Sequence, residues 1–481
     1  MIVQPESVYV IPPNYDMVLE DGMLHLHKQA VTHGFRLSID SFFRSLTQEQ
    51  QDKAIGIGFS GTGSDGTLGM RAIKTEGGML MVQSPESSEY DGMLQSAIAT
   101  GMVDFILSPD QMPTQLIAYT NQAFERKPII AQKTETFMEK IFNLLNTKIG
   151  QDFSNYKDST IKRRIERRMA IKNFKNVAEY AQYLEQNFTE VEALFQDFLI
   201  SITSFFREPT AFEALQKKVI LHLLSSKNSD LVIRIWIPGC STGEEAYSIG
   251  ILLQEQMEIL KQISKVQIFA TDIDSRAIGV ARYGIYPASI FADVSSERLN
   301  HFFTQESNGN YRIKKIIRDM IVFSEQDIIR DPPFSKLNLL TCRNLMIYMN
   351  KELQKKLIPL FHYALKPGGF LFLGSSETVS DFENLYEIID RKSKLYRKKD
   401  VTNALFPIGA FIPLQLKSKQ VSKLSSKAPI ESKFSLRELI EQTILQHNTP
   451  VGVLINQYGD ILYLHGRTGR YLGNWLPERL A

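Results

Sequence analysis

The stretch "IRIWIPGCSTGEEAYSIG", residues 233–250, decides the fold. It begins with an apolar run typical of a buried strand, turns through Gly239 and Gly243, and continues into residues that favour a helix. A strand that leads through glycines into a helix brings backbone close to a ligand and offers free N–H groups to it. The stretch therefore predicts an α/β fold with a ligand at the end of this strand.

The same turn excludes two common ligand sites. A phosphate-binding loop would end in Gly-Lys-Ser/Thr, whereas here Glu244 and Glu245 follow the glycine, and no Gly-x-Gly-x-x-Gly motif is present. The next apolar run, "VQIFATDID", ends in Asp272, at the place where such a sheet binds ribose hydroxyls. We therefore expect a nucleoside without a phosphate chain, and S-adenosyl-L-methionine fits that description.

The overall composition is that of a soluble, intracellular protein. Hydrophobic residues make up 43% and charged residues 22% of the 481 residues. No apolar run approaches the ~18 residues of a membrane span. Two cysteines, Cys240 and Cys342, are too few for a disulfide framework, so a cytoplasmic location without membrane insertion is predicted.

The pattern along the chain predicts several parts. Apolar runs at "SVYVIPP", "MLHLH", "KAIGIGFS", "GGMLMVQ" and "VDFILSP" read as strands, and "IDSFFRSL" and "SDGTLGMRAIKTEG" read as helices between them. The predicted fold class is α/β, with a partial parallel sheet, a small all-helical domain and a Rossmann-like domain carrying a small β insertion. The predicted parts are residues 1–112 (partial sheet), 113–135 (connector), 136–208 (helical), 209–400 (Rossmann-like, insertion at about 283–325), 401–433 (linker) and 434–481 (a truncated module).

Charge is unevenly distributed along the chain. Residues 1–110 carry 14 acidic against 6 basic side chains, whereas residues 157–175 carry eight basic against two acidic ones. The basic stripe is either a solvated helix face or a binding surface for an anionic partner.

Six motifs occur together in the order and spacing of one family. "TSFFREP", "GCSTGEEAYS", "ATDID", "FSEQDI", "CRNLMIYM" and "LKPGGFLFLGSSE", spread over residues 203–377, resemble the CheR-type chemotaxis receptor methyltransferases. The resemblance covers about residues 136–400. It implies transfer of a methyl group from S-adenosylmethionine to glutamate side chains of chemoreceptors, with S-adenosylhomocysteine as product. Glutamate is already ionised at neutral pH, so this chemistry needs positioning and no general base.

The resemblance also implies the residues of the site. Arg207, in a run that reads as helical, would orient the carboxylate, and the Tyr348 hydroxyl would lie near the methyl group. No metal is implied. The implied cofactor contacts are Ser201, Thr203, Arg207, Gly239, Glu244 or Glu245, Asp272, Asp327, Ile328, Cys342 and Arg343. Ser201 stands where the family often has asparagine, which weakens that one contact.

The resemblance favours the binding interpretation of the basic stripe. In the family the helical domain contacts the acidic methylation helices of chemoreceptors. The residues that would do so here are Arg163, Arg164, Arg167 and Arg168.

The first part of the chain resembles a second family. "GFSGTGSDGTLGM" contains no Gly-x-Ser-x-Gly elbow, but it is similar to the segment of CheB-type receptor methylesterases that holds the acid of a Ser/His/Asp triad. Asp65 matches that acid, whereas the serine turn and histidine of the family lie upstream of anything in this chain, and His25, His27 and His33 do not match. We predict an inactive esterase remnant, or a fragment of a longer fusion, whose strands have lost core partners.

Two interpretations compete with the methyltransferase reading. A non-catalytic scaffold could bind S-adenosylmethionine or receptors without turnover. A nucleic-acid methyltransferase is suggested by the basic stripe and by "RDPPF" (residues 330–334), but that motif should follow a strand, and here it precedes one, so no nucleic-acid partner is expected. Residues 434–481 look like the start of a PAS-type sensory module.

Overall fold

The computed structural model describes residues 1–28, 37–124, 134–199, 203–225 and 232–400, and two strands near the C-terminus. The chain divides into two compact units, Met1–Phe406 and Pro407–Ala481. In the second unit, β16 (Gly452–Ile455) pairs with β17 (Ile461–His465) in antiparallel fashion. The predicted linker and most of the PAS-like module lie outside the described residues, and both stay predictions.

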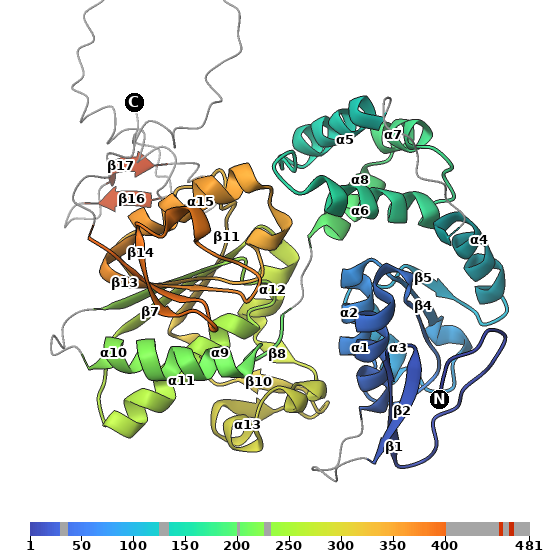
Figure 1. Ribbon diagram of the computed structural model, residues 1–481, viewed down its shortest axis with the longest axis horizontal. Helices are drawn as coiled ribbons and strands as arrows, with labels where there is room; N and C mark the ends of the chain where they lie inside the picture. The colour runs from blue at the N-terminus through green and yellow to red at the C-terminus, as the bar shows by residue number, and fades with distance from the viewer. Residues whose placement is uncertain are drawn as a thin grey trace, which may run out of the picture. The chain divides into compact units, whose positions relative to one another are not determined.

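The first domain is built on a small parallel sheet (Figure 1). The strands β3 (Ile55–Gly58), β4 (Met79–Gln83) and β5 (Phe105–Leu107) lie side by side in that order. The helices α1 (Ser38–Gln50), α2 (Thr67–Glu76) and α3 (Gly92–Ala99) accompany them. A separate antiparallel hairpin consists of β1 (Tyr15–Glu20) and β2 (Met23–Lys28).

The predicted strand "SVYVIPP" is not formed. Val8 and Val10 are 91% and 83% exposed, and the segment ends in two prolines, which cannot donate to a ladder. Its apolar alternation has no partner strand to pair with in the described part of the chain.

Both faces of the parallel sheet are covered. On one face Leu80 and Val82 of β4 pack with Ile73 of α2. On the other, Met79 and Met81 form a cluster with residues of α4 (Met112–Phe124) and of the end of α6 (Asp158–Ile171); the cluster consists of Met79, Met81, Met112, Tyr119, Ala170 and Ile171. The expectation that these strands lack core partners is therefore wrong for this face, because helices from beyond the domain supply them.

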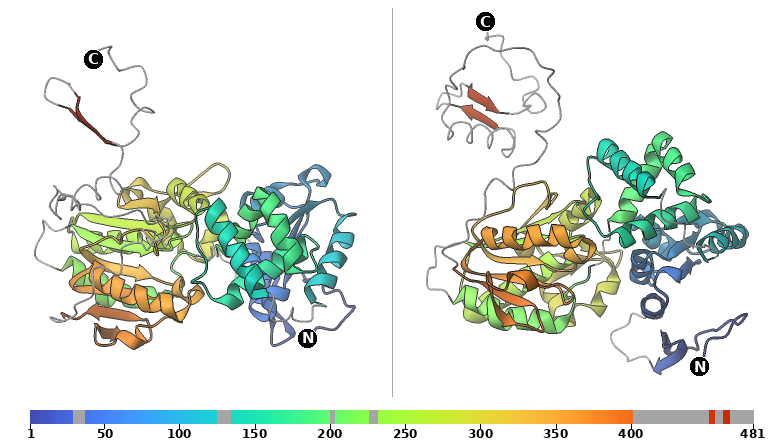
Figure 2. Two further views of the ribbon diagram at one scale, coloured as in Figure 1. Left: turned by 90° about the horizontal axis from the view of Figure 1, so that it is seen from above. Right: turned by 45° about the horizontal axis from the view of Figure 1, so that its top comes forward.

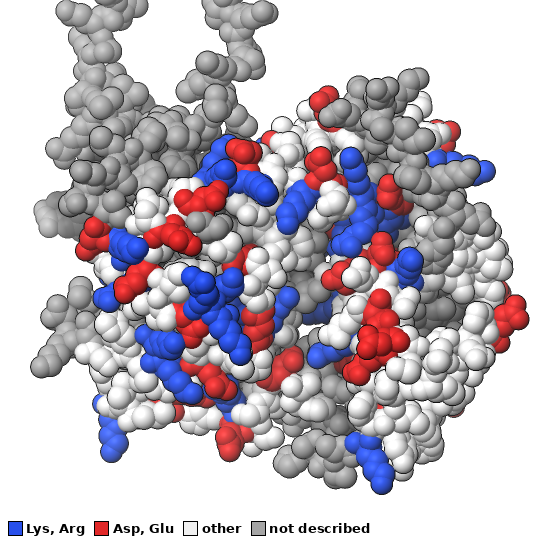
Figure 3. Space-filling model, in the orientation of Figure 1, with Lys and Arg blue, Asp and Glu red and all other residues white. Residues whose placement is uncertain are grey.

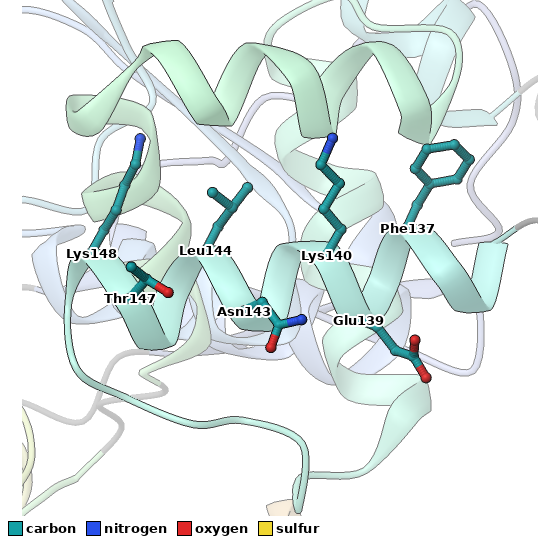
Figure 4. Close-up of a pocket in the computed structure, with 7 residues that line it drawn as sticks. All are labelled: Phe137, Glu139, Lys140, Asn143, Leu144, Thr147 and Lys148. Carbon is teal, nitrogen blue, oxygen red and sulfur yellow. The ribbon is translucent and has the colours of Figure 1, made fainter. Parts of the chain in front are cut away.

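The helical domain comprises α5 (Thr134–Lys148), α6, α7 (Val177–Gln186) and α8 (Phe188–Phe198) around one apolar core. A shallow groove runs along α5, where Phe137, Lys140, Leu144 and Lys148 point toward the neighbouring helix (Figure 4). Lys140 pairs with Glu185 at 2.6 Å, and the Lys148 ammonium donates to two carbonyls at the end of α7. The groove is thus a seam between two packed helices.

The third domain is a doubly wound α/β domain. Its seven-stranded sheet has the order β11-β7-β6-β12-β13-β15-β14; the first five strands are parallel, and β15 pairs in antiparallel fashion with both β13 and β14. The strands are β6 (Ile233–Pro238), β7 (Val266–Asp272), β11 (Ile321–Glu325), β12 (Leu337–Cys342), β13 (Leu365–Leu373), β14 (Tyr386–Asp390) and β15 (Leu395–Lys398).

Successive residues of the central strand serve different cores. Ile235 and Ile237 of β6 belong to the cluster on one face of the sheet, and Trp236 belongs to the cluster on the other. Helices therefore lie on both faces (Figures 1 and 2). They include α9 (Pro209–Leu215), α11 (Glu244–Leu260), α12 (Ser275–Tyr283) and α15 (Lys351–Ala364). The α/β fold class predicted from the sequence is confirmed.

The β insertion is smaller than predicted. Its three short strands are β8 (Ile285–Tyr286), β9 (Phe303–Gln305) and β10 (Tyr311–Ile313), with α13 (Ser296–Phe302) between the first two. The last part of the predicted range, β11, is a strand of the main sheet. The prediction assigned it wrongly because its alternation resembles that of an insertion strand, whereas Ile321 and Phe323 pack into the main core.

Candidate active site

A pocket opens at the carboxyl ends of the central parallel strands. It lies beside β6, where the chain order of the sheet reverses, which is the usual ligand position in such folds. The loops after β6, β7 and β12 form its floor, and three residues of the helical domain close one side. The lining residues are Tyr156, Phe198, Leu199, Thr203, Arg207, Gly239, Cys240, Ser241, Glu245, Asp272, Ile273, Arg343, Asn344, Leu345 and Tyr348.

Two glycines shape the loop after β6. Gly239 has φ of +70°, and a Cβ there would lie 2.9 Å from the side chain of Leu345. Gly243, the N-cap of α11, has φ of +94°, and a Cβ there would lie 2.9 Å from the Ala281 Cβ. Only glycine permits this close backbone cradle. It is the feature expected of a site that admits a nucleoside against the backbone.

Asp272 stands at the end of β7 as predicted. Its Oδ2 accepts a hydrogen bond from the Ser241 N–H at 2.7 Å, and its Oδ1 accepts one from the Asp274 N–H at 2.9 Å. Burial raises the pKa of Asp272 to about 6. Carboxylate oxygens each accept more than one hydrogen bond, so both can still take ribose hydroxyls.

The structure separates the two candidate glutamates. Glu245 lines the pocket, accepts a hydrogen bond from the Thr341 hydroxyl, and lies 3.3 Å from Nη1 of Arg343. Glu244 is buried beneath the loop, where the Thr242 hydroxyl donates to it. Glu245 is therefore the better placed of the two to contact a ligand.

Arg343 lines the pocket, and its buried side chain contacts several residues of the site. Its guanidinium lies over the rings of Phe212 and Phe372 and donates to the Arg207 carbonyl at 3.0 Å. Because the same group pairs with Glu245, it fixes two pocket residues at once. Arg343, a predicted cofactor contact, thus also connects Glu245 to the turn at Arg207.

Arg207 does not lie in a helix, contrary to the prediction. Residues 205–208 form a turn and a bend, and α9 begins only at Pro209. The neighbours Phe206 and Glu208 have φ of +50° and +63°, a region that non-glycine residues rarely adopt. The Ser248 hydroxyl, which accepts from the Phe206 N–H, and Arg343 hold this backbone in place, so the local helical propensity is overridden.

Arg207 and Tyr348 line the same pocket. Burial raises the pKa of the Tyr348 hydroxyl, while the positive charge of Arg207 opposes that rise, so the phenol is neutral at physiological pH. Thr203 lines the pocket as well, whereas Ser201 lies outside the described residues.

The remaining predicted contacts lie near the pocket but do not line it. Asp327 accepts from the Ile329 N–H after β11, and Ile328 packs against the core cluster that contains Trp236. Cys342 is buried in the same cluster, where burial raises its thiol pKa well above the usual value, so no thiolate nucleophile forms there.

Three residues of the site escaped sequence analysis. Tyr156, from the helical domain, lines the pocket, and Thr341 donates to Glu245. Glu377 accepts from four backbone N–H groups, those of Asn344, Leu345, Met346 and Gly374, and so fixes the loop that carries Tyr348. Glu377 lies in the quoted "GSSE" motif, but neither of the other two carried a sequence signal.

Comparison with protein families now identifies the chain. Residues 201–395 match the CheR methyltransferase SAM-binding domain, residues 137–199 its all-alpha domain, and residues 1–116 the CheB methylesterase. A chemotaxis protein methyltransferase of Borreliella burgdorferi is 32% identical over 264 residues, which cover 53% of this chain and 93% of that protein. The chain belongs to the CheR methyltransferase family. It carries the SAM-binding domain of that family, with CheB-type sequence before it.

Other relatives extend the comparison. A 104.1 kDa uncharacterized protein of Rhodobacter capsulatus is 30% identical over 505 aligned positions, covering 98% of this chain, so the chain spans about half (52%) of that relative's length. The CheB methylesterase catalytic domain of Thermotoga maritima is 26% identical, with a TM-score of 0.22, over 23% of this chain and 60% of that one. No helix among the described residues is long and apolar enough to cross a membrane.

Helix α6 carries the basic stripe, and most of its arginine side chains are buried. Arg164, Arg167 and Arg168 are only 2%, 4% and 8% exposed. Arg167 pairs with Asp104 of the CheB-like domain and, at 2.5 Å, with Asp197 of α8, and Arg168 pairs with Glu190 at 2.7 Å. In this arrangement these three arginines cannot contact a receptor, because they bind partners within the chain.

The guanidinium of Arg164 donates hydrogen bonds to two backbone carbonyls of the CheB-like domain, those of Lys74 and Thr75. The acidic first domain is thus the anionic partner of this part of the basic stripe. Arg163 is partly exposed, and Lys157, Lys162, Lys172 and Lys175 are exposed. On the face shown in Figure 3, lysines and arginines are interspersed with acidic residues.

Asp65 of the CheB-like domain performs a structural task. Its carboxylate accepts from the N–H groups of Ile39, Asp40 and Gly66, at 3.1, 3.0 and 2.8 Å, and so caps the start of α1. It borders a largely apolar pocket that also contains Ser60, whereas neither His25 nor His27 lines that pocket. His33 lies outside the described residues.

Replacement of Asp65 by alanine should destabilise the first domain. Loss of the cap leaves N–H groups at the start of α1 without an acceptor and should lower the free energy of unfolding by about 1–2 kcal/mol. Urea unfolding followed by circular dichroism measures this. Asp91→Ala is the matched control, since Asp91 makes no side-chain cap at the start of α3. Equal stabilities of both variants would contradict a capping role.

The segment "RDPPF", which suggested a nucleic-acid methyltransferase, contributes to the packing of the core. Phe334 of "RDPPF" stacks on Phe269 with ring centroids 4.2 Å apart and meets the edge of Trp236. The segment precedes β12, as the sequence indicated, and its aromatic ring is part of a core rather than the wall of a base pocket.

Proposed function

We propose that this protein methylates glutamate side chains in the cytoplasmic methylation helices of chemoreceptors, and that it does so in the cytoplasm. The observation that carries the proposal is the joint placement of Arg207, Tyr348 and Asp272 around one glycine-cradled pocket. The residues that line the pocket offer the polar groups that S-adenosylmethionine would need. Asp272 would hold the ribose, and Glu245 and the loop after β6 would hold the amino-acid end.

The chemistry requires positioning rather than proton transfer. When bound, S-adenosylmethionine supplies an electrophilic methyl group on a sulfonium. Transfer to a glutamate oxygen would form an O–C bond as the C–S bond breaks and the thioether leaves, so the residues of the site would have to align the two groups and would not have to move a proton. Arg207 would orient the carboxylate by its planar guanidinium, and the neutral Tyr348 hydroxyl would lie beside the methyl group.

The exposed part of α6 would guide the acidic receptor helix. The Lys157 N–H donates to the Tyr348 carbonyl at 2.9 Å, so the start of α6 adjoins the loop that carries Tyr348. Lys162 and Arg163 follow within the first turns of this helix. Of the four arginines implied by the resemblance, only Arg163 is therefore retained in this proposal, together with these lysines.

Reversal of the charge at Lys162 should weaken receptor binding. Lys162→Glu should raise the KM for an acidic receptor fragment by about five- to tenfold at low ionic strength, and salt should reduce the difference. Initial rates at varied receptor concentration measure it. Lys175→Glu makes the same charge change on exposed chain beyond the end of α6 and should leave KM near the wild-type value. Equal effects of both variants would contradict a localised surface.

Incubation with methyl-labelled S-adenosylmethionine and receptor fragments tests the proposed activity. Base-labile label on receptor glutamates supports it. Tight cofactor binding without transfer would instead favour a scaffold, and label on DNA or RNA would contradict both readings.

We further propose that the CheB-like part has no esterase activity. The support is that the carboxylate of Asp65 is engaged by backbone N–H groups and that no histidine in the described part of the chain lines its pocket. Release of methanol from methylated receptor by this chain would contradict it.

A further inference from the structure

One arginine of the CheB-like domain lies next to the loop after β6, which shapes the proposed cofactor pocket. Nη1 of Arg71, on α2, lies 3.8 Å from Oε1 of Glu244, the first residue of α11. The side chains are 19% and 5% exposed, respectively. Among the described residues, Arg71 is the only lysine or arginine within ion-pair distance of Glu244. A cation from one domain therefore compensates a buried anion of the other.

Glu244 in turn holds the loop that shapes the cofactor pocket. Both of its carboxylate oxygens accept from the Thr242 hydroxyl, at 2.9 and 2.7 Å. Thr242 is also held through its backbone, because the Tyr286 hydroxyl donates to the Thr242 carbonyl at 2.7 Å. The adjacent Ser241 donates its N–H to Asp272. A continuous set of contacts thus leads from Arg71 to the carboxylate expected to hold ribose.

We propose that Arg71 is a positioning residue for the methyltransferase: it acts through Glu244 on the loop after β6, so the CheB-like domain completes the cofactor site. This inference rests on the proposed use of that pocket by S-adenosylmethionine.

The surroundings of Glu244 make its ionisation depend on Arg71. Burial raises the pKa of Glu244, Arg71 and the Thr242 hydroxyl oppose the rise, and the nearby Asp293 adds to it. The other titratable groups around Glu244 are Tyr247 of α11, Tyr286 of β8 and Cys240 of the loop, and burial raises the pKa of each, so they stay neutral. Without Arg71 the Glu244 carboxylate would take up a proton at a higher pH.

Two further ion pairs of the same polarity support the arrangement. Arg44 of α1 lies 4.0 Å from Asp293, which follows the short helix at Ala288–Ala292. Lys74 of α2 pairs with Asp197 of α8 at 3.2 Å. The first domain has few cations, 6 in residues 1–110, yet three of them face acids of the neighbouring domains. Arg71 thus belongs to an extended interface rather than to an isolated contact.

Calorimetric titration of S-adenosylmethionine into the full chain tests the proposal. Arg71→Met should bind about tenfold more weakly than wild type at the acidic end of a pH series, and the difference should shrink as pH rises, because Glu244 protonates more readily without Arg71. Arg71→Lys should restore the wild-type profile. The control Lys53→Met removes an exposed cation from the same domain and should change nothing.

A double variant separates positioning from a purely structural effect. In a Glu244→Gln background the site has no carboxylate to ionise, so adding Arg71→Met should cause no further pH-dependent loss. Equal binding by wild type and Arg71→Met at every pH, or a pH-independent loss that lysine does not restore, would overturn the proposal. If the wild-type chain itself binds no S-adenosylmethionine, the proposed function fails instead, so the two failures are distinguishable.

Discussion

Arg207→Ala is expected to reduce kcat for receptor methylation by about 10²- to 10³-fold while leaving cofactor affinity within about twofold. The guanidinium lines the pocket beside Tyr348, where it would orient the substrate carboxylate. Arg343 holds the Arg207 carbonyl and Ser248 holds the neighbouring Phe206 N–H, so truncation of the Arg207 side chain should not disturb the loop. Single-turnover transfer of labelled methyl and cofactor titration measure the two quantities separately.

Two further variants sharpen this test. Arg207→Lys keeps the charge but loses the planar fork, so an intermediate rate is expected. Arg276→Ala removes an exposed arginine from the first turn of α12 and should leave the rate unchanged. A wild-type rate for Arg207→Ala would refute the assigned role, and a parallel loss of cofactor binding would place the residue at the cofactor instead.

The largest effect on stability is expected for Arg167→Ala. Arg167 is buried, bonds Asp104 and Asp197, and its Nε donates to the carbonyls of Gly77 and Gly78, both at 3.1 Å. Its removal would leave two buried carboxylates with Lys74 as the nearest remaining cation. Breaking a buried ion pair in this way costs about 3–5 kcal/mol of unfolding free energy. Urea unfolding measures it, with exposed Lys175→Ala as the control on neighbouring sequence.

The same network predicts how stability depends on pH. Burial alone would raise the pKa of Asp104 and of Asp197, but Arg167 and Lys74 outweigh it and lower both pKa values. Carboxyls with a depressed folded-state pKa stabilise the protein above their unfolded value, about 3.8, and this stabilisation is lost as pH falls below it. Acid should therefore destabilise wild type more than Arg167→Ala. A constant difference between the two chains across acidic pH would contradict this.

The central strands and the cofactor loop could be predicted from the sequence because their signals are local. An apolar run followed by glycines and then by a helix former contains the whole strand–turn–helix unit of residues 233–250. The acid at the end of the next strand, Asp272, follows from the same rule. Neither depends on a distant part of the chain, so both were found.

The errors arose where distant residues decide the outcome. The stripe on α6 looked like a receptor surface because a sequence pattern cannot distinguish arginines that meet solvent from arginines that meet Asp104 or Glu190. Arg207 looked helical because the residues that hold its turn, Ser248 and Arg343, come from other elements. Tyr156 enters the pocket only through the packing of the helical domain against the loop at Tyr348.

The apolar cluster between β4, α4 and α6 limits how such a protein can be divided or recombined. Tyr119, only 2% exposed in that cluster, lies between the two family matches, which end at residue 116 and resume at residue 137. Tyr119 therefore belongs to the segment between the two family-matched regions rather than to either of them. A cut at either family boundary would split a single core, and a module exchanged from a relative would have to bring its own counterpart of α4. The two family-matched regions are therefore joined by a shared apolar core as well as by the chain.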